Sequence, residues 1–135
     1  MNTLGLTAAA TAFLSIWGGH VAVRKIEFAS PTIWLPTIVC AVAGIGIEYL
    51  SLVTHNTQLA AAFGIIGITV LFDAFELTRQ QKRIIKGHAP ANPNNPRHAK
   101  ILAEYSSATT LDLLKRDPIG RTVSHEEAVK LISDH

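Results

Sequence analysis

Residues 59–77 read LAAAFGIIGITVLFDAFEL, and residues 78–86 continue as TRQQKRIIK. The first run is almost entirely apolar, and nineteen helical residues span about 29 Å, close to the hydrocarbon thickness of a bilayer. The second run contains four cations, which is typical of the cytoplasmic end of a membrane span. This stretch therefore predicts a transmembrane helix whose C-terminal end lies in the cytoplasm.

Polar side chains line one face of this predicted helix. Asp73, Glu76 and Gln80 are separated by three and four residues, so they share a helical face. Thr69 and Arg83 continue that face in the two directions along the helix. A membrane helix turns such a face toward protein or water and away from lipid. We therefore expect other helices of the chain to cover it.

The composition of the whole chain agrees with a small membrane protein. Its 135 residues allow one domain, and 48% hydrophobic against 16% charged residues is lopsided for a soluble one. The net charge of +2 is too small to indicate binding of nucleic acid. The single cysteine, Cys40, excludes an internal disulfide and a cysteine-rich metal site.

Two further apolar runs, residues 4–23 and 32–53, predict two more spans. The chain starts without side-chain charge and its first cations follow the first run, which is the reverse of a cleaved signal peptide. Residues 54–58 contain no lysine or arginine. The sequence thus predicts an all-α integral membrane protein with three transmembrane helices, the N-terminus outside and the C-terminus in the cytoplasm.

The connections between the spans give further expectations. Residues 24–29 are expected to form a short cytoplasmic loop. Ser30 and Pro31 resemble a helix N-cap followed by proline at the first helical position of the second span. Glu48 lies near the outer end of that span, where its carboxylate would extend toward the outer interface beside Tyr49.

Past residue 86 the chain becomes polar. We expect a transmembrane domain over residues 1–87, with a third helix of 59–78 continuing to about residue 86, where Gly87 can cap it. A cytoplasmic tail over 88–135 would then follow. Its expected parts are a proline- and asparagine-rich linker over 88–96 and helices over 98–115 and 125–132.

This tail is too small to bury a sizeable core alone, so we expect it to contact something else. The apolar positions of its first helix are the candidate docking residues for a cytoplasmic partner surface. They are Ile101, Leu102, Tyr105, Leu111 and Leu114.

Side chains that can perform chemistry gather near the predicted cytoplasmic ends of the first and third spans. The candidate polar network consists of His20, Arg24, Lys25, Glu27, Asp73 and Glu76. One interpretation is a network of interhelical hydrogen bonds and salt bridges that fixes the bundle. The other is a proton or ion relay, or a polar docking site, because acids inside membranes are often functional.

Other kinds of site have weaker support. His20 with Asp73 and Glu76 is an unspecific pattern for a divalent metal, since it joins two acids on one helix to a remote histidine. Only His20 lies within a span, so a bis-histidine haem held by this chain is not expected. There is no phosphate loop, dinucleotide-binding glycine pattern or nucleophile elbow. We therefore predict no catalytic residue, no metal and no cofactor.

Two stretches of the chain resemble a family of small prokaryotic three-span membrane proteins of unknown function. They are residues 63–93, FGIIGITVLFDAFELTRQQKRIIKGHAPANP, and residues 18–28, GGHVAVRKIEF. The matching positions are Glu76, Lys86, Gly87, Asn92 and Pro93 in the first stretch and His20, Lys25 and Glu27 in the second. The chain departs from the family where Val21 replaces a proline and where Thr78-Arg79 replaces part of an acidic run. The resemblance covers residues 1–97 and implies a fold and a topology, without a reaction; the tail from His98 would be an addition.

Two functions remain as expectations. The first is a non-catalytic accessory or structural subunit, or an assembly factor, of a larger membrane protein complex in a prokaryotic inner membrane. Its partners would be the bilayer, other membrane subunits and a cytoplasmic surface for the tail. The alternative is a homo-oligomeric transporter or ion- or proton-conducting unit that uses His20, Asp73 and Glu76. The apolar middle of all three spans favours the first, because a transporter would place polar residues through the whole membrane depth.

Overall fold

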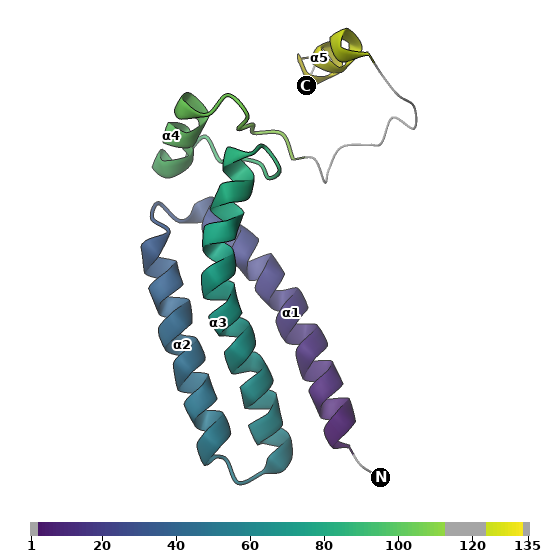
Figure 1. Cartoon of the computed structure of the whole chain (residues 1–135), viewed down its shortest axis with the longest axis vertical. Helices are drawn as coiled ribbons and strands as arrows, with labels where there is room; N and C mark the ends of the chain where they lie inside the picture. Colours follow the sequence, from purple (N-terminus) through teal and green to yellow (C-terminus); the bar gives the residue numbers. More distant parts are fainter. Residues whose placement is uncertain (1–2, 113–123, 134–135) are drawn as a thin grey trace.

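The computed structural model describes residues 3–112 and 124–133 (Figure 1). Helices form all of the regular structure in these residues. They are α1 (Leu4–Ala29), α2 (Trp34–Val53), α3 (Thr57–Ile85), α4 (Pro96–Glu104) and α5 (His125–Ser133). The first three are long and apolar enough to cross a membrane, which confirms the predicted all-helical fold with three candidate spans.

The helix bounds differ from the predicted ones at both ends of the first connection. Residues 24–29, expected to be a loop, are the last part of α1, and the helix ends where the Ser30 N–H donates to the Ile26 carbonyl at 2.8 Å. The second helix begins at Trp34 and not at residue 32. The residue before this helix is Ile33 and no side chain caps it, so Ser30 is not its N-cap. The Ser30 hydroxyl instead donates to the Thr32 carbonyl at 2.7 Å within the connection.

The first tail helix is also shorter than predicted. Of the segment expected to be helical over 98–115, residues 98–104 belong to α4, which starts at Pro96 and ends at Glu104, since Tyr105 has an extended backbone. Residues 113–115 lie outside the described residues. Asn95 caps this helix by accepting the Arg97 N–H at 3.0 Å, and the proline occupies the first turn. The helix expected over 125–132 is α5, which is one residue longer.

The three long helices lie side by side, with α3 in the middle and α1 and α2 each packed on it (Figure 1). On α1 the buried residues Gly19, Val23 and Glu27 follow one another at four-residue intervals and form the face toward α3. This packing explains why α1 continues as a helix past residue 23. Gly44 of α2 permits close contact with α3, because a Cβ at this position would lie 2.9 Å from the Leu71 backbone nitrogen.

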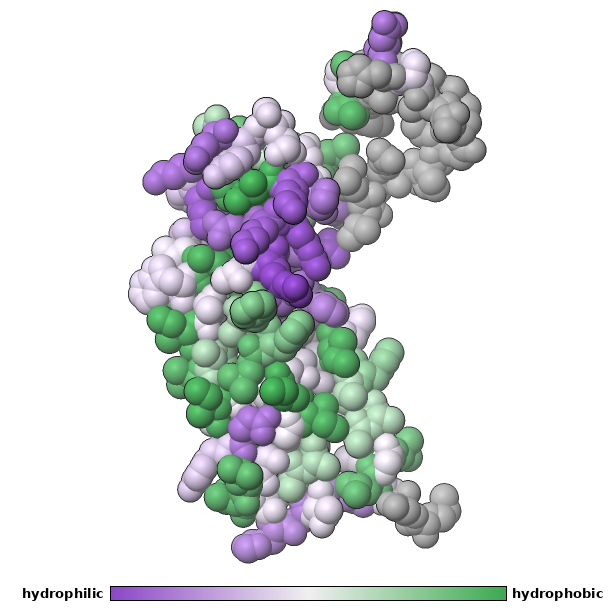
Figure 2. All heavy atoms as spheres, in the orientation of Figure 1, coloured by the Kyte–Doolittle hydropathy of each residue, from purple (hydrophilic) through white to green (hydrophobic). Residues whose placement is uncertain are grey.

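Residues 88–112 pack on the ends of α1 and α3, and we call them the cap. Gly87 terminates α3 with a φ of 70°, as its sequence position predicts, and the His88 N–H donates to the Arg83 carbonyl at 2.8 Å. A small core joins α3 to the cap; its buried residues are Ile84, Ala89, Ala91 and Ile101. The cap is mainly hydrophilic, whereas hydrophobic side chains cover the long helices below it (Figure 2).

Candidate functional site

Glu27, at the end of α1, is the most deeply buried carboxylate among the residues that the structure describes. Its side chain is 1% exposed, and its Oε1 accepts hydrogen bonds from Arg97 Nη1 at 2.7 Å and from His98 Nε2 at 3.1 Å. Arg97 Nη2 also donates to the Glu27 carbonyl at 2.6 Å. Charge-assisted bonds of this kind are stronger than neutral ones. Arg97 and His98 lie at the start of α4, so this carboxylate fastens α4 to α1.

The hydrogen bonds of His98 define its tautomer. The side chain is fully buried, and its Nδ1 lies 2.9 Å from the Asn92 backbone N–H, which donates to it. A nitrogen that accepts a bond has no proton, so the proton of the neutral ring is on Nε2 and points to Glu27. The Phe28 ring meets the imidazole edge-on at 6.2 Å. His98 is thereby held between α1 and the cap.

Two asparagines of the cap bind the end of α1. Asn95 Nδ2 donates to the carbonyls of Phe28 at 3.1 Å and Ser30 at 2.9 Å, and Asn92 Nδ2 also donates to the Phe28 carbonyl at 3.1 Å. The last carbonyls of a helix have no partners inside the helix. The cap therefore satisfies them with side chains. Sequence analysis missed this role; the available signal was Asn95 before Pro96, which predicts a helix start there.

Glu76 lies in a second polar cluster, formed on α3 itself. Its side chain is 5% exposed and pairs with Arg83 at 3.1 Å and with Arg79 at 3.9 Å. Arg83 Nη1 also donates to the buried Gln80 at 3.1 Å. Both arginines are more than half exposed, so water solvates their outer sides. The polar face predicted on this helix is thus buried at Glu76 and Gln80 and exposed at its cations.

The structure divides the predicted polar network into separate parts. Glu27 binds the cap, and Glu76 binds arginines of its own helix. His20, Arg24 and Lys25 are exposed. No three histidine, cysteine or acidic side chains among residues 3–112 and 124–133 are grouped so as to hold a metal ion.

Two acids within the candidate spans each lie against a glycine of the neighbouring helix. A Cβ on Gly19 of α1 would lie 2.6 Å from Asp73 Oδ2, and a Cβ on Gly67 of α3 would lie 2.8 Å from Glu48 Oε1. Glu48 therefore faces α3, and the expectation that it extends to the outer interface is wrong. Helical side chains lean toward the N-terminus of their helix, which for α2 is the capped end. Neither acid forms a salt bridge with another described residue.

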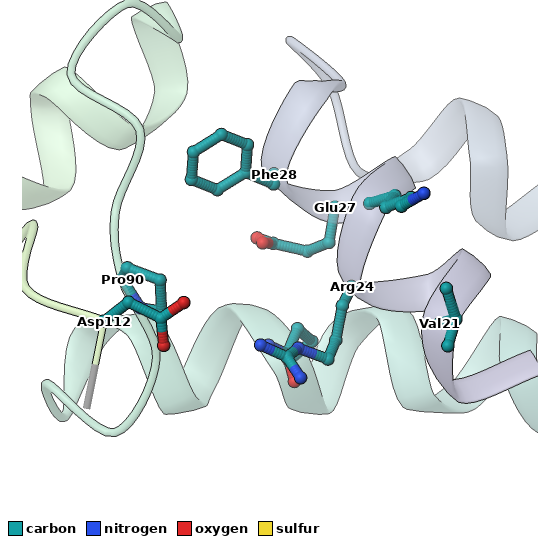
Figure 3. A pocket seen from close by; sticks show the side chains of 8 residues that line it. Val21, Arg24, Glu27, Phe28, Pro90 and Asp112 are labelled. Atoms are coloured by element: carbon teal, nitrogen blue, oxygen red, sulfur yellow. The ribbon is translucent and has the colours of Figure 1, made fainter. Parts of the chain in front are cut away.

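A cavity of about 350 Å³ lies where α1, α3 and the cap meet (Figure 3). Arg24, Glu27 and Phe28 reach it from α1, while Pro90 and Asp112 line it from the cap. Its remaining lining residues are Val21, Lys25 and Gln80. The cavity thus joins apolar side chains to charged ones.

The candidate docking residues of the tail have different environments. Ile101 is 6% exposed inside the core between α3 and the cap, and Leu102 packs against the same core. Tyr105 is exposed and Leu111 is half-buried. Leu114 lies outside the described residues. The first two side chains are therefore used within the chain itself.

Comparison with curated proteins and with solved structures finds no match. A family model described as a domain of unknown function, DUF4491, matches residues 2–95. The matched part contains α1, α2 and α3 together with Asn92 and Asn95, and it ends before the two residues of α4 that bind Glu27. Because the model matches more than half of the chain, this protein belongs to the DUF4491 family.

Proposed function

We propose that this protein is a non-catalytic accessory subunit, or an assembly factor, of a larger membrane protein complex. The observation that carries the proposal is the small area that the long helices bury within the chain. In the most apolar window of α1 and of α2, 6% of the residues are buried, and the share in α3 is 11%. The outer faces of α1 and α2 in particular are therefore free to contact lipid or further helices.

Three glycines on α1 and α2 support helices as partners. A Cβ added to Gly5, Gly18 or Gly46 would meet nothing within 4 Å, unlike one added to Gly19 or Gly44. Small residues on the outer face of a membrane helix allow another helix to approach closely. Among the described residues, no side chain occupies the space beside these three glycines.

The buried polar groups support a structural role. Glu27 is fixed by Arg97 and His98, and Glu76 by arginines of its own helix. A carboxylate with such partners is held in one geometry. Such a fixed carboxylate is better suited to holding the cap in place than to a catalytic or transport cycle.

We also propose an orientation, in a prokaryotic inner membrane, with the cap in the cytoplasm. Cations of α1 and α3 gather at the capped end, and the connection between α2 and α3 has none. The test uses single cysteines at Asn56 and Ser107 in a Cys40→Ser background. An impermeant thiol reagent on intact cells is expected to label position 56 and to spare position 107, and the reverse pattern would refute the orientation.

The function is tested by purifying the tagged full chain from native membranes in a mild detergent and identifying co-purifying proteins by mass spectrometry. We expect a defined set of membrane proteins in constant ratio to the chain. Gly46→Leu, which blocks an open position, should reduce their yield. The matched control is Phe72→Leu, at a 53% exposed residue of α3. A chain that purifies alone, with yields unaffected by either change, would overturn the proposal.

A second function, transport by a homo-oligomer, is favoured by the two acids within the spans. Asp73 and Glu48 lack a salt-bridge partner among the described residues, so a bound proton or cation would satisfy them. Liposomes containing the pure protein separate the two functions. A flux driven by a pH or ion gradient that Asp73→Asn abolishes would support transport, whereas liposomes without flux leave the accessory function preferred.

A further inference from the structure

We propose that the cavity between α1, α3 and the cap binds the headgroup of an anionic phospholipid. Its position is the first argument. The cavity lies between the end of α1, α3 and the cap. At the capped end of the molecule, hydrophilic side chains adjoin the hydrophobic surface of the long helices (Figure 2). In a membrane, this is the level of the lipid headgroups.

One face of α1 leads from the membrane into the cavity. Trp17, Val21 and Phe28 follow spacings of four and seven residues, so they lie on the same side of the helix as Arg24 and Lys25. The three apolar side chains are 63%, 38% and 41% exposed. Trp17 and Val21 come before the two cations along α1 and Phe28 comes after them, so exposed apolar surface leads up to the cations. A phospholipid has the same order, with acyl chains followed by a phosphodiester.

The charges of the cavity favour an anion. Arg24 and Lys25 take part in none of the salt bridges among the described residues. Glu27 adds little negative charge, because Arg97 and His98 bind its carboxylate. Among the described residues of the lining, Asp112 is then the one further acid, against two cations. Basic pockets at the ends of membrane helices bind lipid headgroups in this way.

The remaining groups suit a hydroxylated headgroup. Arg24 and Lys25 would bind the phosphodiester oxygens. Gln80, from α3, offers a side-chain oxygen that accepts a hydrogen bond from a glycerol hydroxyl of phosphatidylglycerol. Phosphatidylethanolamine has no net charge, so it would leave one cation without a counter-charge. About 350 Å³ is at the lower end of ligand-site volumes, so the cavity takes the headgroup while the chains stay outside along α1.

The test is native mass spectrometry of the full-length protein in detergent, titrated in parallel with phosphatidylglycerol and phosphatidylethanolamine. We expect preferential binding of phosphatidylglycerol. The double variant Arg24→Gln/Lys25→Gln should weaken it about tenfold. The matched control is Lys82→Gln/Lys86→Gln, which removes the same charge from two exposed residues at the end of α3 that do not line the cavity. It should change binding less than about twofold.

A second variant keeps the test independent of any effect of the double variant on folding. Asp112→Asn removes the acid that opposes the cations, so it should strengthen binding of phosphatidylglycerol. Weaker binding by this variant, equal losses in the two double variants, or equal binding of the two lipids would each overturn the proposal. Displacement of the lipid by glycerol 3-phosphate at equal concentration would also overturn it, because the site would then be one for a soluble phosphate ester.

Discussion

Removal of the Glu27 carboxylate should release the cap from α1. In Glu27→Ala the Arg97 guanidinium, 12% exposed, stays in its buried site without its counter-charge, and His98 loses the acceptor of its Nε2 proton. Breaking a buried ion pair by removing one partner costs about 3–5 kcal/mol. The Arg97 bond to the backbone carbonyl of residue 27 remains, so we expect about 3 kcal/mol, the lower end of that range.

Hydrogen exchange measured by mass spectrometry tests this magnitude directly. A loss of about 3 kcal/mol in the opening free energy of the cap corresponds to exchange roughly a hundredfold faster in peptides from residues 88–104. Peptides from the middle of α3 serve as the internal reference, because their amides bond within the helix and should keep their protection. We therefore expect faster exchange in residues 88–104, which Glu27 fastens to α1, and unchanged exchange in the middle of α3.

Glu76→Ala is the matched control for this prediction. Glu76 is also buried, but its partners Arg79 and Arg83 are more than half exposed, so water can solvate the charges that remain. Pairs of this kind contribute up to about 1 kcal/mol, and the variant should speed exchange less than about fivefold. Similar exchange in the two variants, or a change in Glu27→Ala confined to α3, would refute the argument that burial of the remaining partner sets the cost.

Three further substitutions test the packing of the chain, each by thermal unfolding in detergent. Gly44→Ala places a Cβ against the Leu71 backbone and should cost about 1–3 kcal/mol, whereas Gly46→Ala, which meets nothing, should be neutral; equal effects would contradict the close contact of α2 with α3. Gly87→Ala forces a side chain into a positive-φ position and should cost about 1–3 kcal/mol; an unchanged midpoint would contradict the conformation assigned to the end of α3. Asn95→Ala removes the bonds to the Phe28 and Ser30 carbonyls and the N-cap bond of α4, and should cost about 1–3 kcal/mol; an unchanged midpoint would show that water replaces them.

The sequence predicts the three spans and the end of α3 well, because both depend on local properties. Length and hydropathy identify a membrane helix within one segment, and Gly87 follows the last helical turn with the φ of 70° that glycine adopts easily. The same local reasoning failed for residues 24–29. Their cations are typical of a loop, but burial of Glu27 next to α3 extends the helix. Tertiary contact overrides the local pattern there.

The partners of Glu27 could not be predicted from local pattern. Arg97 and His98 are 70 and 71 residues away along the chain, and no spacing rule relates positions so distant. Their approach depends on the Schellman-type end of α3 and on the asparagines that bind α1. The orientation of Glu48 was missed for a similar reason, since it depends on the space that Gly67 leaves on another helix.

The accessory-subunit proposal makes its sharpest prediction about the outer faces of α1 and α2. A photo-crosslinking amino acid at Leu14 or Val42, each one turn before an open glycine, can report what occupies those faces in native membranes. Position 72, an exposed phenylalanine of α3, is the control. We expect crosslinks from positions 14 and 42 to one defined membrane protein and none to that protein from position 72. Crosslinks only to lipid or to a second copy of this chain would contradict the proposal.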